Sequence, residues 1–370
     1  MLSDVLRTLC SRTSRDAAIP GIDGLRCYAA VMVILAHSKL GSAGWGATGV
    51  WLFFTLSGML LTPSLVRAVK SPDLTRQVLA YLIRRIFRIM PAFIFVLAFS
   101  CIVVWKKKGG WFNYDVFWLH LTFQIARWHF WTIKTEMLLY LGLPLVVGVL
   151  AFLRGWQLVV VAAMMLAGTY LVTEYSPLKE IAVSSKRNMH IYATPFLIGA
   201  LLALANPTMP DRVRNLCFWI GVAGLALLSS DVEYIIALRQ MIAIHGITLP
   251  WDFPALIYPF AALTVFGASG NGAWILNNRV VQTIGVVGFS VYLWQSFVLH
   301  LLRKYGVKDP AILFLSALPL TLLLSILTYH FIEVPGQRLG AMLSRTISGQ
   351  KKPVNEIALS ESSTGARANP

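Results

Sequence analysis

The sequence predicts an all-α protein, a polytopic transmembrane helix bundle with about ten spans. Of its 370 residues, 57% are apolar and only 13% are charged, whereas a soluble protein carries about 25% charged residues. The mean hydropathy of +0.67 points the same way. In addition, apolar runs of roughly 17–25 residues, long enough to cross a hydrocarbon core of ~30 Å, recur along the chain.

The expected spans are apolar runs bounded by turn residues and charges. They lie near 24–40, 47–66, 86–105, 131–153, 156–173, 191–206, 216–230, 254–270, 284–302 and 311–331. An even number of spans places both termini on the same side. Because cytoplasmic loops carry an excess of Lys and Arg, the basic segment 67–88 and the basic C-terminal tail predict that this side is cytoplasmic. The lysines at 106–108 then fall outside. We expect a multi-pass protein of the cell membrane, either the inner or the plasma membrane.

The chain divides into three predicted parts. Residues 1–19 are polar and basic, lack the apolar core of a signal peptide, and read as a cytoplasmic N-terminal segment. Residues 20–335 form the membrane domain, in which 231–253 is expected to be an outer loop or a re-entrant segment. Residues 336–370 are rich in Ser, Lys and Asn without an apolar period, which predicts a disordered cytoplasmic tail.

The net charge of +16 does not indicate a nucleic-acid partner, because no soluble basic domain carries it. Basic loops beside apolar spans instead suit the anionic headgroups of membrane lipids. The four cysteines are scattered and lack the spacing of a disulfide framework or a zinc site; they are Cys10, Cys27, Cys101 and Cys217. We therefore expect no metal.

The first candidate site lies in the opening span. Arg26 and His37 are eleven residues apart, close to three helical turns, so both side chains project from nearly the same face and are separated by roughly 16 Å. With Arg26 at the helix entrance, His37 lies near mid-membrane, where an ionisable group indicates a functional site. The alternative is a histidine hydrogen-bonded between helices without chemistry.

The second candidate site is a basic cluster at the inner end of the third span. Arg84 and Arg88 are four residues apart and Arg85 and Arg88 are three apart, so they share one helical surface. Guanidinium groups bind phosphate in bidentate fashion, which favours a phosphorylated cytosolic ligand. The alternative is ordinary anchoring of a cytoplasmic helix end.

The third candidate site is a polar stripe made of Thr132, Glu136 and Tyr140, at positions i, i+4 and i+8 of an apolar span. Lys134 lies on the opposite side and can reach outward. A carboxylate within the membrane needs a partner, and either His37 or Arg26 would serve. The alternative is a structural ion pair between helices.

In chain order, these stretches resemble the acyltransferase 3 family of integral-membrane acyltransferases over most of residues 20–340. Six motifs carry the resemblance: Arg26 and His37; segment 49–58 (GVWLFFTLSG); Arg85 and Arg88 followed by Pro91; Trp131 to Glu136 followed by Tyr140; Tyr292 to Trp294; and Glu333 to Pro335. Two residues depart from the pattern. Gln295 stands where many members have histidine, so we give it no proton-transfer role, and Lys134 is an unusual charge in its motif. We also expect no fused extracellular esterase-like domain.

The resemblance implies an acyl-CoA donor, most often acetyl-CoA, and a hydroxyl acceptor on a carbohydrate such as a surface polysaccharide or a lipid-linked glycan. His37 would act as general base or carry the acyl group as an acyl-imidazole. Glu136 would orient or balance His37. Arg26 would hold the phosphate end of the pantetheine arm or pair with Glu136. The CoA phosphates would be bound by Arg84, Arg85 and Arg88.

Two other classes of function compete with this reading. The first is a secondary transporter or flippase that uses His37 and Glu136 as a proton relay. No pair of Gly/Pro-broken spans recurs at corresponding places in two halves of the chain, as inverted repeats would require. The second is a non-catalytic membrane scaffold, which does not need Arg26 and His37 in register.

Overall fold

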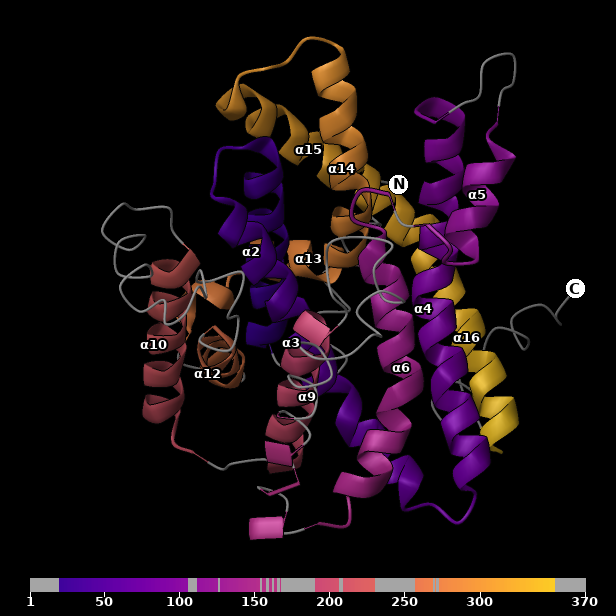
Figure 1. Cartoon of the computed structure of the whole chain (residues 1–370), viewed down its shortest axis with the longest axis vertical. Helices are drawn as coiled ribbons and strands as arrows, with labels where there is room; N and C mark the ends of the chain where they lie inside the picture. The colour runs from indigo at the N-terminus through magenta and orange to yellow at the C-terminus, as the bar shows by residue number, and fades with distance from the viewer. Residues whose placement is uncertain are drawn as a thin grey trace, which may run out of the picture.

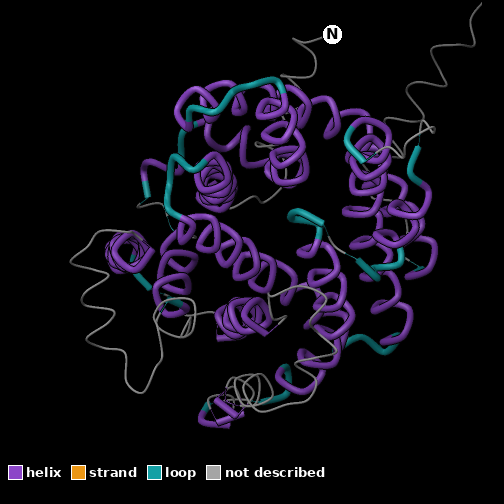
Figure 2. Tube along the Cα trace, turned by 45° about the horizontal axis from the view of Figure 1, so that its top comes forward, coloured by secondary structure: helices purple, strands orange, loops and turns teal. Residues whose placement is uncertain are grey.

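The computed structural model describes residues 20–105, 112–125, 127–153, 190–205, 209–229, 257–268 and 273–349, together with a few isolated positions between 155 and 167 and at 270. Within these residues every regular element is a helix (Figures 1 and 2). The expected span 156–173 lies largely outside the described residues, as do segments 1–19, 231–253 and 350–370. The all-α class is therefore confirmed for the described part of the chain.

The elements follow one another without any strand among the described residues. They are α2 (Pro20–Ser38), α3 (Ala43–Val69), α4 (Leu74–Val103), α5 (Tyr114–Leu121), α6 (Trp131–Leu150), α9 (His190–Ala205), α10 (Asp211–Ser229), α12 (Tyr258–Ala268), η2 (Trp274–Leu276), α13 (Arg279–Val286), α14 (Gly288–Lys304), α15 (Pro310–Thr328), the π-helical turn η3 (Tyr329–Glu333) and α16 (Val334–Ser348).

Five described helical segments are long and apolar enough to cross a membrane: α3, α4, α6, α10 and the continuous segment Pro310–Ser348. A sixth span arises if α13 and α14, which meet at a bend of 73°, count as one. The helices α9 and α12 are apolar but shorter. The helix α2 falls outside this set because Asp23, Arg26 and His37 lower its hydropathy. The described residues thus hold five or six candidate spans, and the count of about ten for the whole chain stays a prediction.

The start of α2 differs from the expectation. The helix begins at Pro20, so Arg26 lies almost two turns inside it rather than at its entrance, and His37 lies in its last turn. Arg26 donates a hydrogen bond to Asp23 Oδ1 at 2.8 Å, one turn earlier on the same helix. The intrahelical carboxylate stabilises the guanidinium and allows the helix to extend toward its N-terminus.

Residues 336–348, expected to belong to a disordered tail, instead form most of α16. This helix lies along α4 (Figure 1), and small residues at its interface allow the contact. A Cβ atom at Gly340 would lie 2.5 Å from Phe87 Cβ, and one at Gly336 would lie 2.8 Å from Pro91 Cγ. Small residues four apart let two helices approach closely, a pattern that composition alone did not reveal.

The close contact between α3 and α9 also depends on glycine. A Cβ atom at Gly58 would lie 1.9 Å from the carbonyl oxygen of Phe196, and one at Gly199 would lie 2.0 Å from the carbonyl oxygen of Thr55. Neither position can accept a side chain without moving a backbone. This contact fixes the part of α3 that faces the candidate site.

We therefore expect Gly58→Ala to lower the free energy of unfolding by about 1–3 kcal/mol, the usual cost of overpacking. Thermal unfolding of the purified protein in detergent measures the effect. The control is Gly142→Ala on α6, where no heavy atom lies within 4 Å of the added Cβ. Equal stability of the two variants would contradict the close helix contact.

Candidate active site

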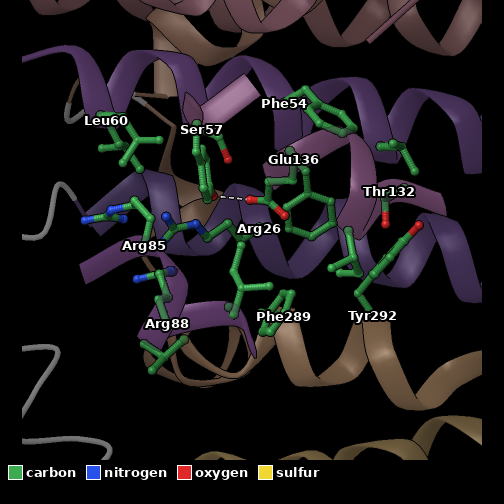
Figure 3. Close-up of a pocket in the computed structure, with 18 residues that line it drawn as sticks. Arg26, Phe54, Ser57, Leu60, Arg85, Arg88, Thr132, Glu136, Phe289 and Tyr292 are labelled. Atoms are coloured by element: carbon green, nitrogen blue, oxygen red, sulfur yellow. Dashed lines mark hydrogen bonds between the residues drawn. The ribbon is translucent and has the colours of Figure 1, made fainter. Parts of the chain in front are cut away.

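A cavity of about 290 Å³ lies in the bundle and is lined by residues of α2, α3, α4, α6, α13 and α14. We call it the arginine cavity. Its polar lining residues are Arg26, Ser57, Arg85, Arg88, Thr132, Glu136, Tyr140 and Tyr292. Figure 3 shows the guanidinium groups of Arg26, Arg85 and Arg88 gathered at one end, with the hydroxyl groups of Thr132 and Tyr292 at the other.

Positive charge exceeds negative charge in the arginine cavity. Three guanidinium groups face a single lining carboxylate, Glu136, which accepts a hydrogen bond from Tyr140 on the next turn of α6. The buried Nε atom of Arg85 has no hydrogen-bond partner. Because buried donors in native proteins are normally paired, this atom and the excess charge favour an anionic ligand such as a phosphate.

Of the three arginines in the predicted basic cluster, two line this cavity. Arg84 does not, and its Nη1 atom donates to Ser344 Oγ of α16 at 2.7 Å. The physical reason is helical geometry, since consecutive residues point about 100° apart and Arg84 therefore faces α16 while Arg85 faces the cavity. Arg84 therefore does not line the cavity that Arg85 and Arg88 share, and ligand binding by the cluster stays a prediction.

A second cavity, of about 250 Å³, contains the candidate histidine. We call it the histidine cavity; it is lined by His37, Trp128, His129, Ser296, Leu299, His300 and Arg303. Two consecutive residues of α14 contact its two inner imidazoles. His37 Nδ1 lies 2.8 Å from Gln295 Oε1, and His129 Nδ1 lies 2.8 Å from Ser296 Oγ. Arg303 donates to the carbonyl oxygen of His37.

The two cavities are stacked along α2 and α14. On α2, Arg26 lines the first cavity and His37 the second, as the eleven-residue spacing predicts for one helical face. On α14, Tyr292 lines the first cavity and Ser296 the second, one turn later. The helical rise places the two α2 side chains roughly 16 Å apart.

The predicted pairing of Glu136 with His37 is not what the cavities show. Glu136 lines the arginine cavity together with Arg26, and His37 lines the histidine cavity. Of the two partners considered from the sequence, Arg26 is the one that shares a cavity with the carboxylate. Lys134 lines neither of these two cavities, in keeping with its position on the opposite side of α6.

The connector before α6 carries Trp128, which the sequence did not single out, and His129, which the sequence offers as a candidate because it lies next to the Glu136 span. Trp128 has a left-handed φ of 53°, a conformation that is costly for a bulky residue and marks a constrained position. The carbonyl oxygen of His129 accepts hydrogen bonds from Thr132 Oγ1 at 2.9 Å and from the Tyr292 hydroxyl at 3.4 Å. These two hydrogen bonds hold the backbone of His129, whose ring lines the histidine cavity.

His120 on α5 holds the start of this connector. Its Nδ1 lies 2.7 Å from the carbonyl oxygen of Val116, and its Nε2 accepts from the backbone N–H of Arg127 at 3.0 Å. A carbonyl needs an N–H donor and a backbone N–H needs a lone pair, so the ring is the neutral Nδ1–H tautomer. Its ring stacks on Trp105 with centroids 5.2 Å apart.

The family to which the chain belongs follows from comparison with known proteins. A family model described as an acyltransferase domain, of the acyltransferase 3 type, matches residues 19–330. The chain belongs to the acyltransferase 3 family. The resemblance is therefore confirmed over residues 19–330, which hold five of the six motifs; the sixth motif, Glu333 to Pro335, lies beyond the match.

Individual proteins of known name match the chain at low sequence identity. The chain is 23% identical over 368 residues to the O-acetyltransferase OatA of Staphylococcus aureus, and 22% identical over 364 residues to a putative O-acetyltransferase of the same species. Each alignment covers 87% of this chain and 58% of the relative, so the chain spans little more than half the length of these proteins. No solved structure matches the chain significantly.

Within the described residues, no group of three or more His, Cys, Asp or Glu side chains could hold a metal ion.

The His120 contacts predict a pH dependence of the connector. Burial lowers the pKa of His120 below its usual value, so the unfolded segment binds a proton more readily than the folded one. The stabilisation is complete above about pH 6.5, the pKa of an exposed histidine, and is lost as the pH falls toward the folded pKa. Protonation removes the acceptor for the Arg127 N–H.

Hydrogen exchange between pH 7.5 and pH 5, corrected for the intrinsic rates, measures the protection of residues 120–130. We expect protection to fall at the lower pH in the native chain. His120→Phe, which keeps a ring against Trp105 but cannot titrate, should show weaker protection that does not change with pH. Unchanged protection in the native chain would show that His120 does not hold the connector.

Proposed function

We propose that this chain is a membrane O-acyltransferase that moves an acyl group, most simply acetyl, from cytosolic acyl-CoA to a hydroxyl of a carbohydrate acceptor at the cell membrane. The acceptor would be a surface polysaccharide or a lipid-linked glycan. Membership of the acyltransferase 3 family and the O-acetyltransferase relatives support this activity. The observation that carries the proposal is the stacking of an arginine cavity and a histidine cavity along the same two helices.

In this proposal the arginine cavity holds the donor. Arg85 and Arg88 bind CoA phosphates, and Arg26 binds the phosphate end of the pantetheine arm. Glu136, with Tyr140, balances the guanidinium charge within the same cavity rather than orienting His37. Arg84 has no part in donor binding because it is bonded to α16. The flexible arm then carries the thioester along α2 toward His37.

His37 supplies the activated nucleophile that a thioester needs. The acceptor hydroxyl oxygen attacks the thioester carbonyl carbon, the C–S bond breaks, the hydroxyl proton passes to the imidazole, and the departing thiolate then takes that proton. An alternative two-step route forms an acyl-imidazole first and transfers the acyl group to the hydroxyl second. Both routes need an imidazole with one lone pair available for reaction.

The proton-relay transporter is a weaker candidate. It needs His37 and Glu136 to exchange a proton, and the two side chains line different cavities.

Purified protein incubated with labelled acetyl-CoA and glycans from the native cell separates the two functions. Label on the glycan supports the enzyme, whereas a glycan that crosses a vesicle membrane unmodified contradicts it. Mass comparison of surface glycans with and without the gene identifies the acceptor.

We expect His37→Ala to abolish transfer, with a loss of at least about 100-fold, the usual contribution of a general base. The variant should remain folded because His37 lies beside a cavity. Label transfer to the glycan is the measurement. His330→Ala on η3 is the matched control, since His330 lines neither the arginine nor the histidine cavity. Retained transfer in His37→Ala would remove His37 from the mechanism.

We expect the double variant Arg85→Gln/Arg88→Gln to raise the KM for acetyl-CoA by about 10- to 100-fold, since two charge-assisted contacts to phosphate are lost. The matched control is Arg84→Gln, one residue away on α4, which should leave KM unchanged. Initial rates at varied acetyl-CoA measure both. An equal rise in KM for Arg84→Gln would show that the cluster acts through its net charge rather than through the cavity.

A further inference from the structure

The amide of Gln295 is the side chain bonded to the ring nitrogen of His37 that faces α14. Its Oε1 atom lies 2.8 Å from His37 Nδ1, and its side chain is 1% exposed. An amide oxygen can only accept a hydrogen bond, so Nδ1 of His37 carries the proton in this arrangement. The Nε2 atom of the neutral ring is then left with the lone pair.

The amide nitrogen of Gln295, unlike its oxygen, makes no hydrogen bond. The Nε2 atom of Gln295 is buried and has no hydrogen-bond partner, an arrangement that lowers the stability of the folded state. A side chain selected only for packing would avoid this cost, and methionine of similar shape would remove it. A costly buried polar group next to a proposed catalytic ring is a sign of function.

Among the described residues that line the histidine cavity with His37, those that can carry a charge are His129, His300 and Arg303. None of these lining residues is a carboxylate. The uncharged amide of Gln295 holds the ring without the stabilisation of imidazolium that a carboxylate in its place would provide.

We propose that Gln295 is a positioning residue that fixes His37 as the neutral Nδ1–H tautomer and directs the lone pair of Nε2 to the reacting group. This inference rests on the proposed function, because it assumes that His37 takes the hydroxyl proton or the acyl group. It assigns a role in the reaction to a residue that never touches the substrate. The role follows from one hydrogen bond on the side of the ring away from the chemistry.

The first test replaces the amide by a side chain of similar shape without hydrogen-bonding groups. Gln295→Met should lower kcat by about 10- to 100-fold, the usual effect of removing a residue that orients a histidine, and leave the KM for acetyl-CoA unchanged. Thermal stability should stay close to that of the native chain, because the substitution also removes the unpaired amide N–H. A purely structural role predicts the opposite, namely lost stability with unchanged kcat.

The second test keeps the acceptor and adds a charge. Gln295→Glu still accepts from Nδ1, so activity should persist, but the carboxylate stabilises imidazolium. The acid limb of the pH–rate profile should therefore move to higher pH by about one unit or more. If the amide were reversed, with its N–H donating to His37, Gln295→Glu would lose activity at all pH values, and the proposed tautomer would be wrong.

The matched control is Thr321→Val on α15. Thr321 is fully buried and its Oγ1 also lacks a hydrogen-bond partner, but it lines neither cavity, so kcat and the pH profile should not change. If the native chain transfers label and Gln295→Met transfers it equally well, the positioning role is overturned and the proposed function stands. If the native chain transfers no label, both are overturned.

Discussion

The structure depends on the register between α2 and α14, two neighbouring helices that place polar side chains at matching levels inside an apolar bundle. Polar groups in such an interior must find partners within the protein, because neither lipid nor water supplies them. His37 finds Gln295, and Arg26 finds Asp23. The His37–Gln295 contact joins α2 to α14 at one level, whereas the Arg26–Asp23 contact lies within α2. The arginine cavity and the histidine cavity lie at successive levels of the two helices, and neighbouring helices complete their walls.

The two cavities differ in electrostatic character because each lies at a different level of α2 and α14 and is lined by different side chains. The arginine cavity combines three guanidinium groups with one carboxylate, so it suits a multiply charged anion. The histidine cavity is lined by exposed His300 and Arg303, and the rings of His37 and His129 have uncharged hydrogen-bond partners, Gln295 and Ser296. The three guanidinium groups of the arginine cavity lie at another level of α2 and α14 than the His37 ring. Arg303 contacts His37 at its backbone carbonyl oxygen.

The sequence predicted what a helical period alone determines. The structure agrees with the common face of Arg26 and His37 and with the polar stripe through Glu136, and Lys134 is not among the residues that line the arginine cavity. The pairing of Glu136 with His37 could not be read from the sequence, because it depends on how far α6 is displaced along α2. Gln295 was set aside because it cannot transfer a proton, although a residue that orients another needs no proton of its own.

The sequence also does not predict the helix boundaries or the contacts between helices. α2 includes Pro20 to Gly24 ahead of Arg26, where Asp23 accepts a hydrogen bond from the guanidinium group, and α16 packs against α4. Neither produces a signal in composition or apolar run length. The separation of Arg84 from Arg85 likewise needed the position of Ser344, which is distant in the chain.

One consequence of the shared register concerns how such a protein can change. Adding one residue to α2 between Arg26 and His37 would turn the imidazole by about 100° and detach it from Gln295. An insertion of three or four residues, about one turn, keeps His37 directed toward α14 and lengthens the distance between Arg26 and His37 by roughly 5 Å. The distance between the two cavities can therefore change only in steps of about one helical turn, and a longer α2 needs a matching extension of α14.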